Sequence, residues 1–142
     1  MADVLREHLA QLAAEAGRVG AGRDARITQA ELRRLIDQLP LAALVANDAG
    51  LYVETNKAAS ALTGYPAAEL NRLSVWHLTP LPNAREGEVL WRAFLQQGAQ
   101  SGTYSLLTKD GRIITTTYAA QAHVLPGLHV SLLRASDIAV PR

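Results

Sequence analysis

The hydrophobic positions near the start of the chain recur at helical spacing. They are Leu5, Leu9, Leu12 and Ala16. Since an amphipathic helix places such positions on one face, the pattern predicts a helix over residues 3–16. Three glycines follow within residues 17–22, and they predict a flexible hinge.

A second helix is predicted from about Thr28 to Gln38, because Pro40 prevents its continuation. Thr28 and Glu31 have the spacing of a capping box. Ile27 and Leu32 occupy the two positions of a hydrophobic staple. The two helices and their hinge form an N-terminal extension over residues 1–38.

Apolar residues of this second helix have the spacing of a coiled-coil seam. They are Leu32, Ile36 and Leu39, with Leu35 beside them. Two interpretations stay open, because fewer than two heptads fit. The seam belongs to a dimer or signal helix, or the helix covers one face of its own domain.

The next segment has the pattern of a β-hairpin followed by a short helix. Residues 41–46 are all apolar, residues 47–50 have turn chemistry, and residues 51–55 favour a strand. Asn56 can accept amide protons at a helix start, and Gly64 stands where a left-handed C-cap is needed.

Further elements follow in the order helix, turn, helix and three strands. The helices are 67–73 and 85–97, with a turn or single helical loop at 75–78 between them; the strands are 103–108, 112–124 and 128–134. On the longer helix, Leu90, Trp91, Phe94 and Leu95 form a predicted buried stripe. The order predicts an α+β domain with a five-stranded antiparallel sheet and helices over one face.

Composition narrows the class of protein. The 142 residues allow one domain with an appendage, and the net charge of +1 gives no footprint for nucleic acid or an anionic membrane. Cysteine is absent, which excludes disulfides, thiolate zinc sites and cysteinyl-flavin photochemistry. No segment has about 18 consecutive apolar residues and the N-terminus has no signal pattern. We therefore expect a cytoplasmic protein.

Several short motifs stand in the order and spacing of a known family. They are Asp48-Ala-Gly50, Asn56 with Ala58-Ala59, Thr63-Gly64-Tyr65, Glu69-Leu70 and Lys109-Asp110-Gly111. With them, residues 39–138 resemble a PAS sensory domain. The resemblance implies a small cavity between the sheet and the helices, which holds a cofactor, a metabolite or nothing. Residues 139–142 would lead to a missing or separate output domain.

The resemblance also implies an ion pair between Glu69 and Lys109 that holds the helical block to the sheet. Two solvated charges that never meet are the alternative. Two departures from the family pattern are visible. Arg72 replaces a small residue, and Asp137-Ile138-Ala139 stands where an Asp-Ile-Thr motif is usual.

The candidate pocket residues are apolar or amphipathic, as those of a ligand cavity would be. They are Leu44, Ala46, Ala61, Leu62, Trp76, Leu78, Leu90, Phe94, Tyr118 and Leu132. Core packing explains the same residues equally well. The cofactor stays open between haem, a small organic or fatty ligand, and none.

Enzymatic chemistry is not indicated by any motif. The four histidines lack metal-ligand spacing, and no nucleophile elbow or phosphate loop occurs. The histidine that a haem could use is His77, on the short turn before the long helix; the alternative is a histidine that caps local backbone beside Trp76.

The sequence thus predicts a regulatory input domain and not an enzyme. We expect a bacterial-type PAS domain that forms a homodimer through its N-terminal helices and controls a histidine kinase or a transcription regulator. The alternatives are a ligand-free protein interaction module and a haem gas sensor acting through His77. Neither nucleic acid nor membrane is an expected partner.

Overall fold

The computed structural model describes residues 2–20, 25–80 and 84–135. Five strands form one sheet in the order β2-β1-β5-β4-β3, and every neighbouring pair is antiparallel. The strands are β1 (Ala42–Ala46), β2 (Tyr52–Thr55), β3 (Ala99–Leu107), β4 (Ile113–Leu125) and β5 (Leu128–Ala135). The predicted α+β fold is confirmed, because the early hairpin and the three later strands share this sheet.

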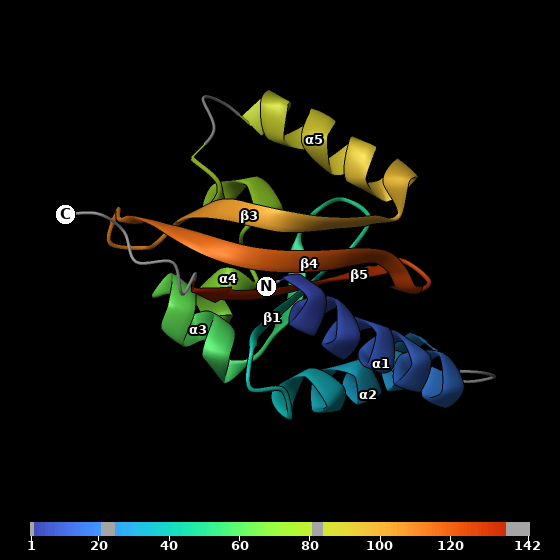
Figure 1. The fold of residues 1–142 in the computed structure, drawn as a ribbon. Coiled ribbons are helices and arrows are strands. Elements are labelled where there is room, and N and C mark those ends of the chain that lie inside the picture. The colour runs from blue at the N-terminus through green and yellow to red at the C-terminus, as the bar shows by residue number, and fades with distance from the viewer. Residues whose placement is uncertain (1, 21–24, 81–83, 136–142) are drawn as a thin grey trace.

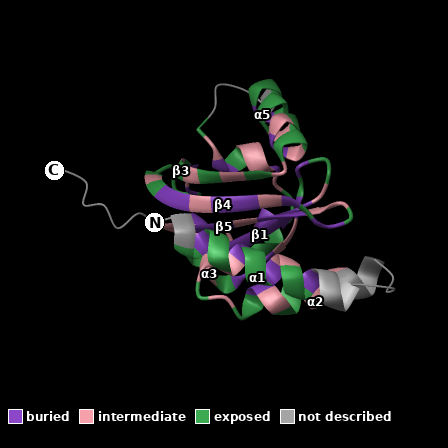
Figure 2. Ribbon diagram, turned by 45° about the vertical axis from the view of Figure 1, so that its right-hand side comes forward, coloured by how far each residue is buried: buried purple, intermediate pink, exposed green. Residues whose placement is uncertain are grey.

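Helices cover both faces of the sheet (Figure 1). On one side lie α3 (Lys57–Thr63), α4 (Ala67–Leu70), the 3-10 helix η1 (Val75–Leu78) and α5 (Ala84–Gln97). On the other side lie α1 (Ala2–Gly20) and α2 (Ala25–Asp37). Figure 2 shows that β1, β4 and β5 are largely buried, whereas β3 and α5 are mostly exposed or half-buried.

Two hydrophobic cores result, one on each face of the sheet. The core under α1 and α2 contains Leu5, Leu9, Leu12, Leu32, Ile36, Val45, Val130 and Leu132, among others. The core on the opposite face includes Leu44, Ala59, Leu70, Leu78, Leu106 and Leu133. Since side chains alternate along a strand, Leu132 and Leu133 of β5 serve different cores.

The turn and the cap predicted after the first strand are present. Gly50 has φ 83°, and Asn47 Oδ1 accepts from the backbone N–H groups of Ala49 and Leu51. Asn56 is the N-cap of α3, since its Oδ1 accepts from the Ala59 N–H at 2.9 Å. Gly64 ends the helix at φ 80°, a conformation that glycine adopts without steric cost.

Several element boundaries differ from the prediction. The first helix continues to Gly20 instead of ending at 16, and α2 begins at Ala25, a turn before Thr28. The predicted staple and capping box rest on the side chains of Ile27 and Thr28, which lie outside the described residues, as do hinge residues 21 and 22.

The start of β3 also differs, because the strand begins at Ala99 and not at 103. Its first four residues pair with residues 118–121 of β4, from Ala99 with Gln121 to Gly102 with Tyr118. This pairing across the sheet outweighs the low strand preference of a Gln-Ser-Gly segment. A further difference is that α4 ends at Leu70, earlier than the predicted 73.

Leu32 and Ile36 lie within the core of their own chain, each with 0% exposure. They therefore follow the second interpretation of the seam, in which the helix covers its own domain. Leu35 and Leu39 are only partly buried against this core. Among the described residues, no helix is both long enough and apolar enough to cross a membrane.

Candidate ligand cavity

A cavity of about 470 Å³ lies between the sheet and the layer formed by η1 and α5. This volume is within the range of small-molecule sites. Seven of the ten predicted pocket residues line it: Leu44, Ala46, Trp76, Leu78, Leu90, Phe94 and Tyr118. They come from β1, η1, α5 and β4, so elements distant in the sequence form one site.

The other three predicted pocket residues do not line the cavity. Leu132 faces the core under α1 and α2, because its neighbour Leu133 occupies the cavity side of β5. Ala61 is on the exposed side of α3, and Leu62 packs at the edge of the core beside the cavity. These three assignments were wrong, since apolar character alone does not show which face a residue occupies.

Leu90 belongs to the cavity wall although its side chain is 52% exposed. The predicted buried stripe of α5 is thus incomplete at this position. Leu90 marks the point where the cavity wall meets solvent, whereas Phe94, one turn later, is buried.

The sequence analysis did not predict several polar residues of the cavity wall. They include Tyr52, Thr79, Gln97, Gln100, Tyr104, His129 and Ser131. The alternation of side chains along a strand could have indicated these residues. Tyr52 is buried ahead of two half-buried residues on β2. His129, Ser131 and Leu133 lie on one face of β5. This alternation identifies the residues of the cavity wall only when the face of each strand that points inward is known.

The tyrosines of the wall are uncharged. Burial raises the pKa of Tyr104 to about 12, and its hydroxyl forms a hydrogen bond with Thr79 Oγ1. Burial also raises the pKa of Tyr118, whose hydroxyl lies 3.5 Å from Gln100 Oε1. The pKa of Tyr52 is raised well above its usual value, first by burial and then by Tyr104.

Trp76, which lines the cavity, packs closely against two glycines. A Cβ atom on Gly87 of α5 would lie 2.3 Å from Trp76 Cβ, and one on Gly50 would lie 2.9 Å from Trp76 Cζ3. Only residues without a side chain permit this approach. Trp91 connects α5 to the turn after β1, because its Nε1–H donates to the Asp48 carbonyl at 2.9 Å.

Asp48, His123 and His129 form a cluster in which the possible ligand atoms lie within 4.8 Å of one another. The His123 backbone N–H donates to His129 Nδ1 at 2.8 Å, so the ring proton is on Nε2, which donates to Asp48 Oδ1 at 2.7 Å. A metal ion at Nε2 would move that proton to Nδ1, where it would meet the His123 N–H. The cluster therefore fits a neutral, hydrogen-bonded histidine and not a metal centre.

His77 does not line the cavity. Its side chain is exposed, and its Nδ1 accepts from the Ser74 backbone N–H at 2.9 Å. The ring of His77 closes the local turn of η1 and does not point into the cavity. The capping interpretation is the one that the hydrogen bond supports.

Glu69 and Lys109 are in contact. Lys109 Nζ lies 2.8 Å from Glu69 Oε1, and the Lys109 backbone N–H donates to the Thr63 carbonyl at 2.9 Å. Both side chains of the ion pair are about half exposed, so the pair contributes no more than about 1 kcal/mol. Together the two contacts attach the β3–β4 turn to α3 and α4.

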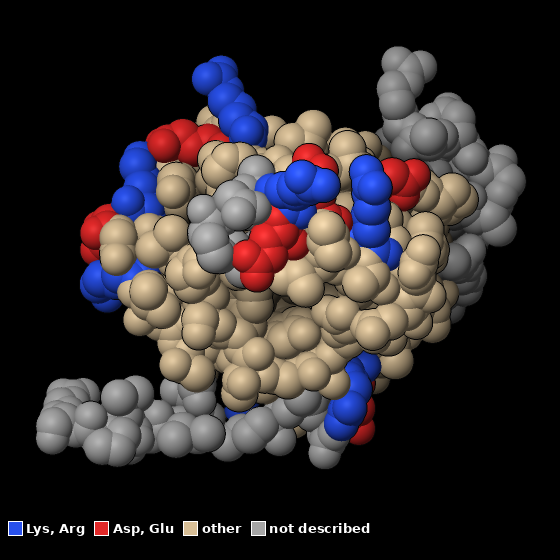
Figure 3. Space-filling view, turned by 90° about the horizontal axis from the view of Figure 1, so that it is seen from above, with Lys and Arg blue, Asp and Glu red and all other residues tan. Residues whose placement is uncertain are grey.

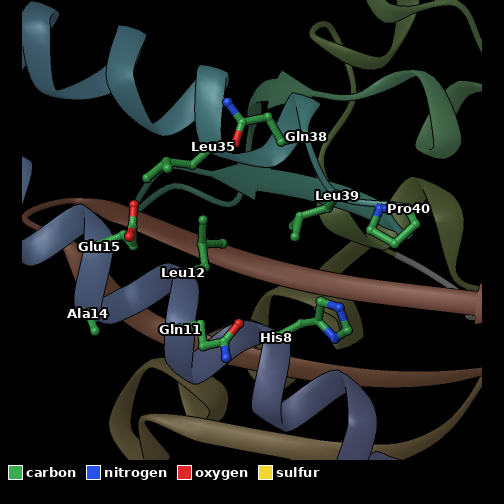
Figure 4. Close-up of a pocket in the computed structure, with 9 residues that line it drawn as sticks. All are labelled: His8, Gln11, Leu12, Ala14, Glu15, Leu35, Gln38, Leu39 and Pro40. Atoms are coloured by element: carbon green, nitrogen blue, oxygen red, sulfur yellow. The ribbon is translucent and has the colours of Figure 1, made fainter.

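A second, more open hollow lies between α1 and the end of α2, and we call it the α1–α2 groove (Figure 4). It is lined by His8, Gln11, Leu12, Ala14, Glu15, Leu35, Gln38, Leu39 and Pro40. Two of the four predicted seam residues, Leu35 and Leu39, thus face this groove.

Seen from the side of α5, charged side chains of both signs lie next to one another (Figure 3). The described residues form no extended area of one sign on this face.

Several proteins of known structure have a fold similar to that of this chain. Similar solved structures include a PAS domain from Desulfitobacterium hafniense, with 19% identity, a TM-score of 0.63, and coverage of 72% of this chain and 99% of that one. A domain of a sensory box sensor histidine kinase/response regulator from Geobacter sulfurreducens has 18% identity, a TM-score of 0.62, and coverage of 79% and 97%.

A third similar structure is the PAS domain of a LuxR-family transcriptional regulator from Burkholderia thailandensis, in complex with ethanol. It has 15% identity, a TM-score of 0.59, and coverage of 72% of this chain and 95% of that one. No curated protein sequence matches significantly. The family model described as PAS fold matches residues 30–138, which is most of the chain. The chain therefore belongs to the PAS-fold family.

Proposed function

We propose that this chain is the sensory input domain of a signalling protein and that its cavity takes a small ligand. The observation that carries the proposal is the cavity itself, which lies between the sheet and α5 and has polar groups among apolar walls. A core filled by side chains would leave no such volume.

The fold supplies a route from the cavity to the N-terminal helices. His129 lies in the cavity wall, and its ring accepts the N–H of His123 at the irregular end of β4. The next residues, Val124 and Leu125, pack in the core under α1 and α2. A ligand that shifts His129 would therefore alter the packing on the opposite face of the sheet.

The signalling partner is proposed as a histidine kinase or a transcription regulator. Similar PAS domains come from a sensor histidine kinase and from a LuxR-family regulator, which supports these two classes. Homodimerisation is proposed through the α1–α2 groove, because Leu35 and Leu39 are the seam residues that keep exposed surface there.

Hydrogen–deuterium exchange tests the sensory proposal. Compounds retained by the protein are first identified by native mass spectrometry, and exchange is then compared with and without them. We expect a retained compound to slow exchange in α5 and to change it in α1 and α2. A protein that retains no compound, and that responds to none from a metabolite panel, would instead be a ligand-free interaction module.

A further inference from the structure

None of the described residues that line the cavity is Asp, Glu, Lys or Arg. His129 is neutral there, since burial is the main cause that lowers its pKa and its Nδ1 accepts a backbone N–H. A buried carboxylate, phosphate or ammonium group needs an opposite charge or several hydrogen bonds to offset its lost hydration. The wall supplies no opposite charge.

Aromatic side chains form much of the wall. They are Trp76, Trp91, Phe94, Tyr104 and Tyr118. The Trp91 and Phe94 ring centroids lie 5.3 Å apart, and those of Tyr104 and Tyr118 lie 5.8 Å apart, both pairs in tilted or edge geometry. Rings held in this way can take a further planar ring by stacking or by edge contact.

The hydroxyl of Tyr52 is a polar group of the wall that can bind a ligand. Tyr52 is 7% exposed, and its hydroxyl forms no hydrogen bond with any residue that the structure describes. The hydroxyls of Tyr104 and Tyr118, by contrast, meet Thr79 and Gln100. The Tyr52 hydroxyl keeps accessible surface, since it is not one of the enclosed polar atoms that lack a partner, and a ligand in the cavity can therefore form a hydrogen bond with it.

We infer that the cavity takes an uncharged, planar aromatic molecule that carries one hydroxyl or a similar group bonded to Tyr52. This inference rests on the proposed sensory function and specifies the chemical class of its ligand. The aromatic walls favour the ring, the absence of charge rejects ionised compounds, and Tyr52 selects the polar group.

Three probes of one ring system test the inference by isothermal titration calorimetry at neutral pH. They are 2-naphthol, naphthalene and 2-naphthoate, which differ in a hydroxyl, a hydrogen and a carboxylate. We expect 2-naphthol to bind about 3- to 10-fold more tightly than naphthalene, which is the range for one hydrogen bond. Binding of 2-naphthoate is expected to be at least about 10-fold weaker than that of 2-naphthol.

The Tyr52→Phe variant removes only the hydroxyl. It is expected to bind 2-naphthol as weakly as naphthalene and to leave naphthalene binding unchanged. Equal loss for both probes would mean that Tyr52 acts through packing, which would overturn its assigned role as the hydrogen-bonding residue.

A charge placed at the cavity edge provides a second test that does not disturb the core. Leu90 is half exposed and lines the cavity, whereas the adjacent Val89 is 62% exposed and does not line it. Leu90→Lys should therefore strengthen 2-naphthoate binding several-fold, and Val89→Lys should leave it unchanged. Equal effects of the two lysines would show that the anion binds outside the cavity and would overturn the assignment.

Different results would contradict the proposed ligand class and the proposed sensory function. If the unaltered protein binds 2-naphthoate as tightly as 2-naphthol, or binds none of the three probes, the inference is overturned while the sensory proposal stands. If 2-naphthol binds as expected but leaves hydrogen exchange in α1 and α2 unchanged, the sensory proposal fails and the ligand class stands.

Discussion

His129 donates its Nε2 proton to Asp48 Oδ1 at 2.7 Å, although His129 is 2% exposed and the Asp48 side chain is largely in solvent. The same ring accepts the backbone N–H of His123, which has a left-handed φ of 57°. Asp48 in turn accepts the Trp91 Nε1–H through its carbonyl. One turn residue therefore connects the sheet, the irregular end of β4 and helix α5.

This arrangement predicts that stability falls in mild acid. Burial, as the largest cause, lowers the pKa of His129, and the charge of His123 acts in the same direction, while Asp48 opposes them. Below the unfolded value of about 6.5, the unfolded chain binds a proton that the folded ring resists. The free energy of unfolding should therefore decrease as the pH falls from about 6.5 towards the lower folded pKa.

Urea unfolding at a series of pH values measures this effect. In His129→Gln, the dependence should flatten over that interval, although the variant is less stable at neutral pH. The control is His8→Gln, because His8 lies outside the two cores, on α1, and its ring forms a hydrogen bond with the Val4 carbonyl of its own helix. An unchanged slope in His129→Gln would assign the acid sensitivity to other groups.

Local features of the fold could be predicted from the sequence, because their causes lie within a few residues. The Asn47 turn, the Asn56 cap and the Gly64 helix stop each depend on one side chain and its neighbours in the chain. The face that a strand residue occupies is different in kind. Leu132 and Leu133 are chemically identical, and only the pairing of β5 with β1 and β4 decides which of them meets the cavity.

The coverage of the sheet by α1 could not be predicted for a related reason. An amphipathic pattern shows that a helix buries one face, but not against which surface. The same limit applies to the seam on α2, where Leu32 and Ile36 meet the domain itself. Likewise, the partners of His129 lie 6 and 81 positions away in the sequence, beyond any local motif.

Asn56 is predicted to be among the most sensitive positions in the chain. Beyond capping α3, its Nδ2 donates to the carbonyls of Ile36 and Leu41, both at 2.8 Å, and its Oδ1 accepts from the Ala43 N–H at 3.0 Å. Asn56→Ala should cost at least about 2 kcal/mol of unfolding free energy, because several buried groups lose their partner.

Thermal and chemical unfolding of Asn56→Ala measure this loss, with Asn71→Ala as the control at an exposed position. Hydrogen exchange should also rise near Ile36, where α2 ends. If both variants were equally stable, the four hydrogen bonds of Asn56 would have no net value.

Gly87→Ala is predicted to disturb the cavity although alanine favours helices. Alanine would improve helix propensity by about 1 kcal/mol at an ordinary helical position. Here its Cβ would lie 2.3 Å from Trp76 Cβ, so α5 or η1 must move. We expect lower stability and a changed fluorescence spectrum, since Trp76 and Trp91, the two tryptophans of the chain, both line the cavity. The exposed neighbour Glu88→Ala is the control, and a more stable Gly87→Ala protein would contradict the close approach.

The proposed dimer is testable only at seam residues that the domain does not use itself. Ile36→Asp would bury a carboxylate in the core and unfold the chain, so a loss of dimer there would have no meaning. Leu39→Asp places the charge in the α1–α2 groove, on a residue that is only partly buried. If the groove joins two copies, this variant should be monomeric by light scattering and keep its fold, whereas Ala10→Asp, on the exposed side of α1, should remain dimeric. Equal masses for the unaltered protein and for Leu39→Asp would remove the groove as a dimer contact.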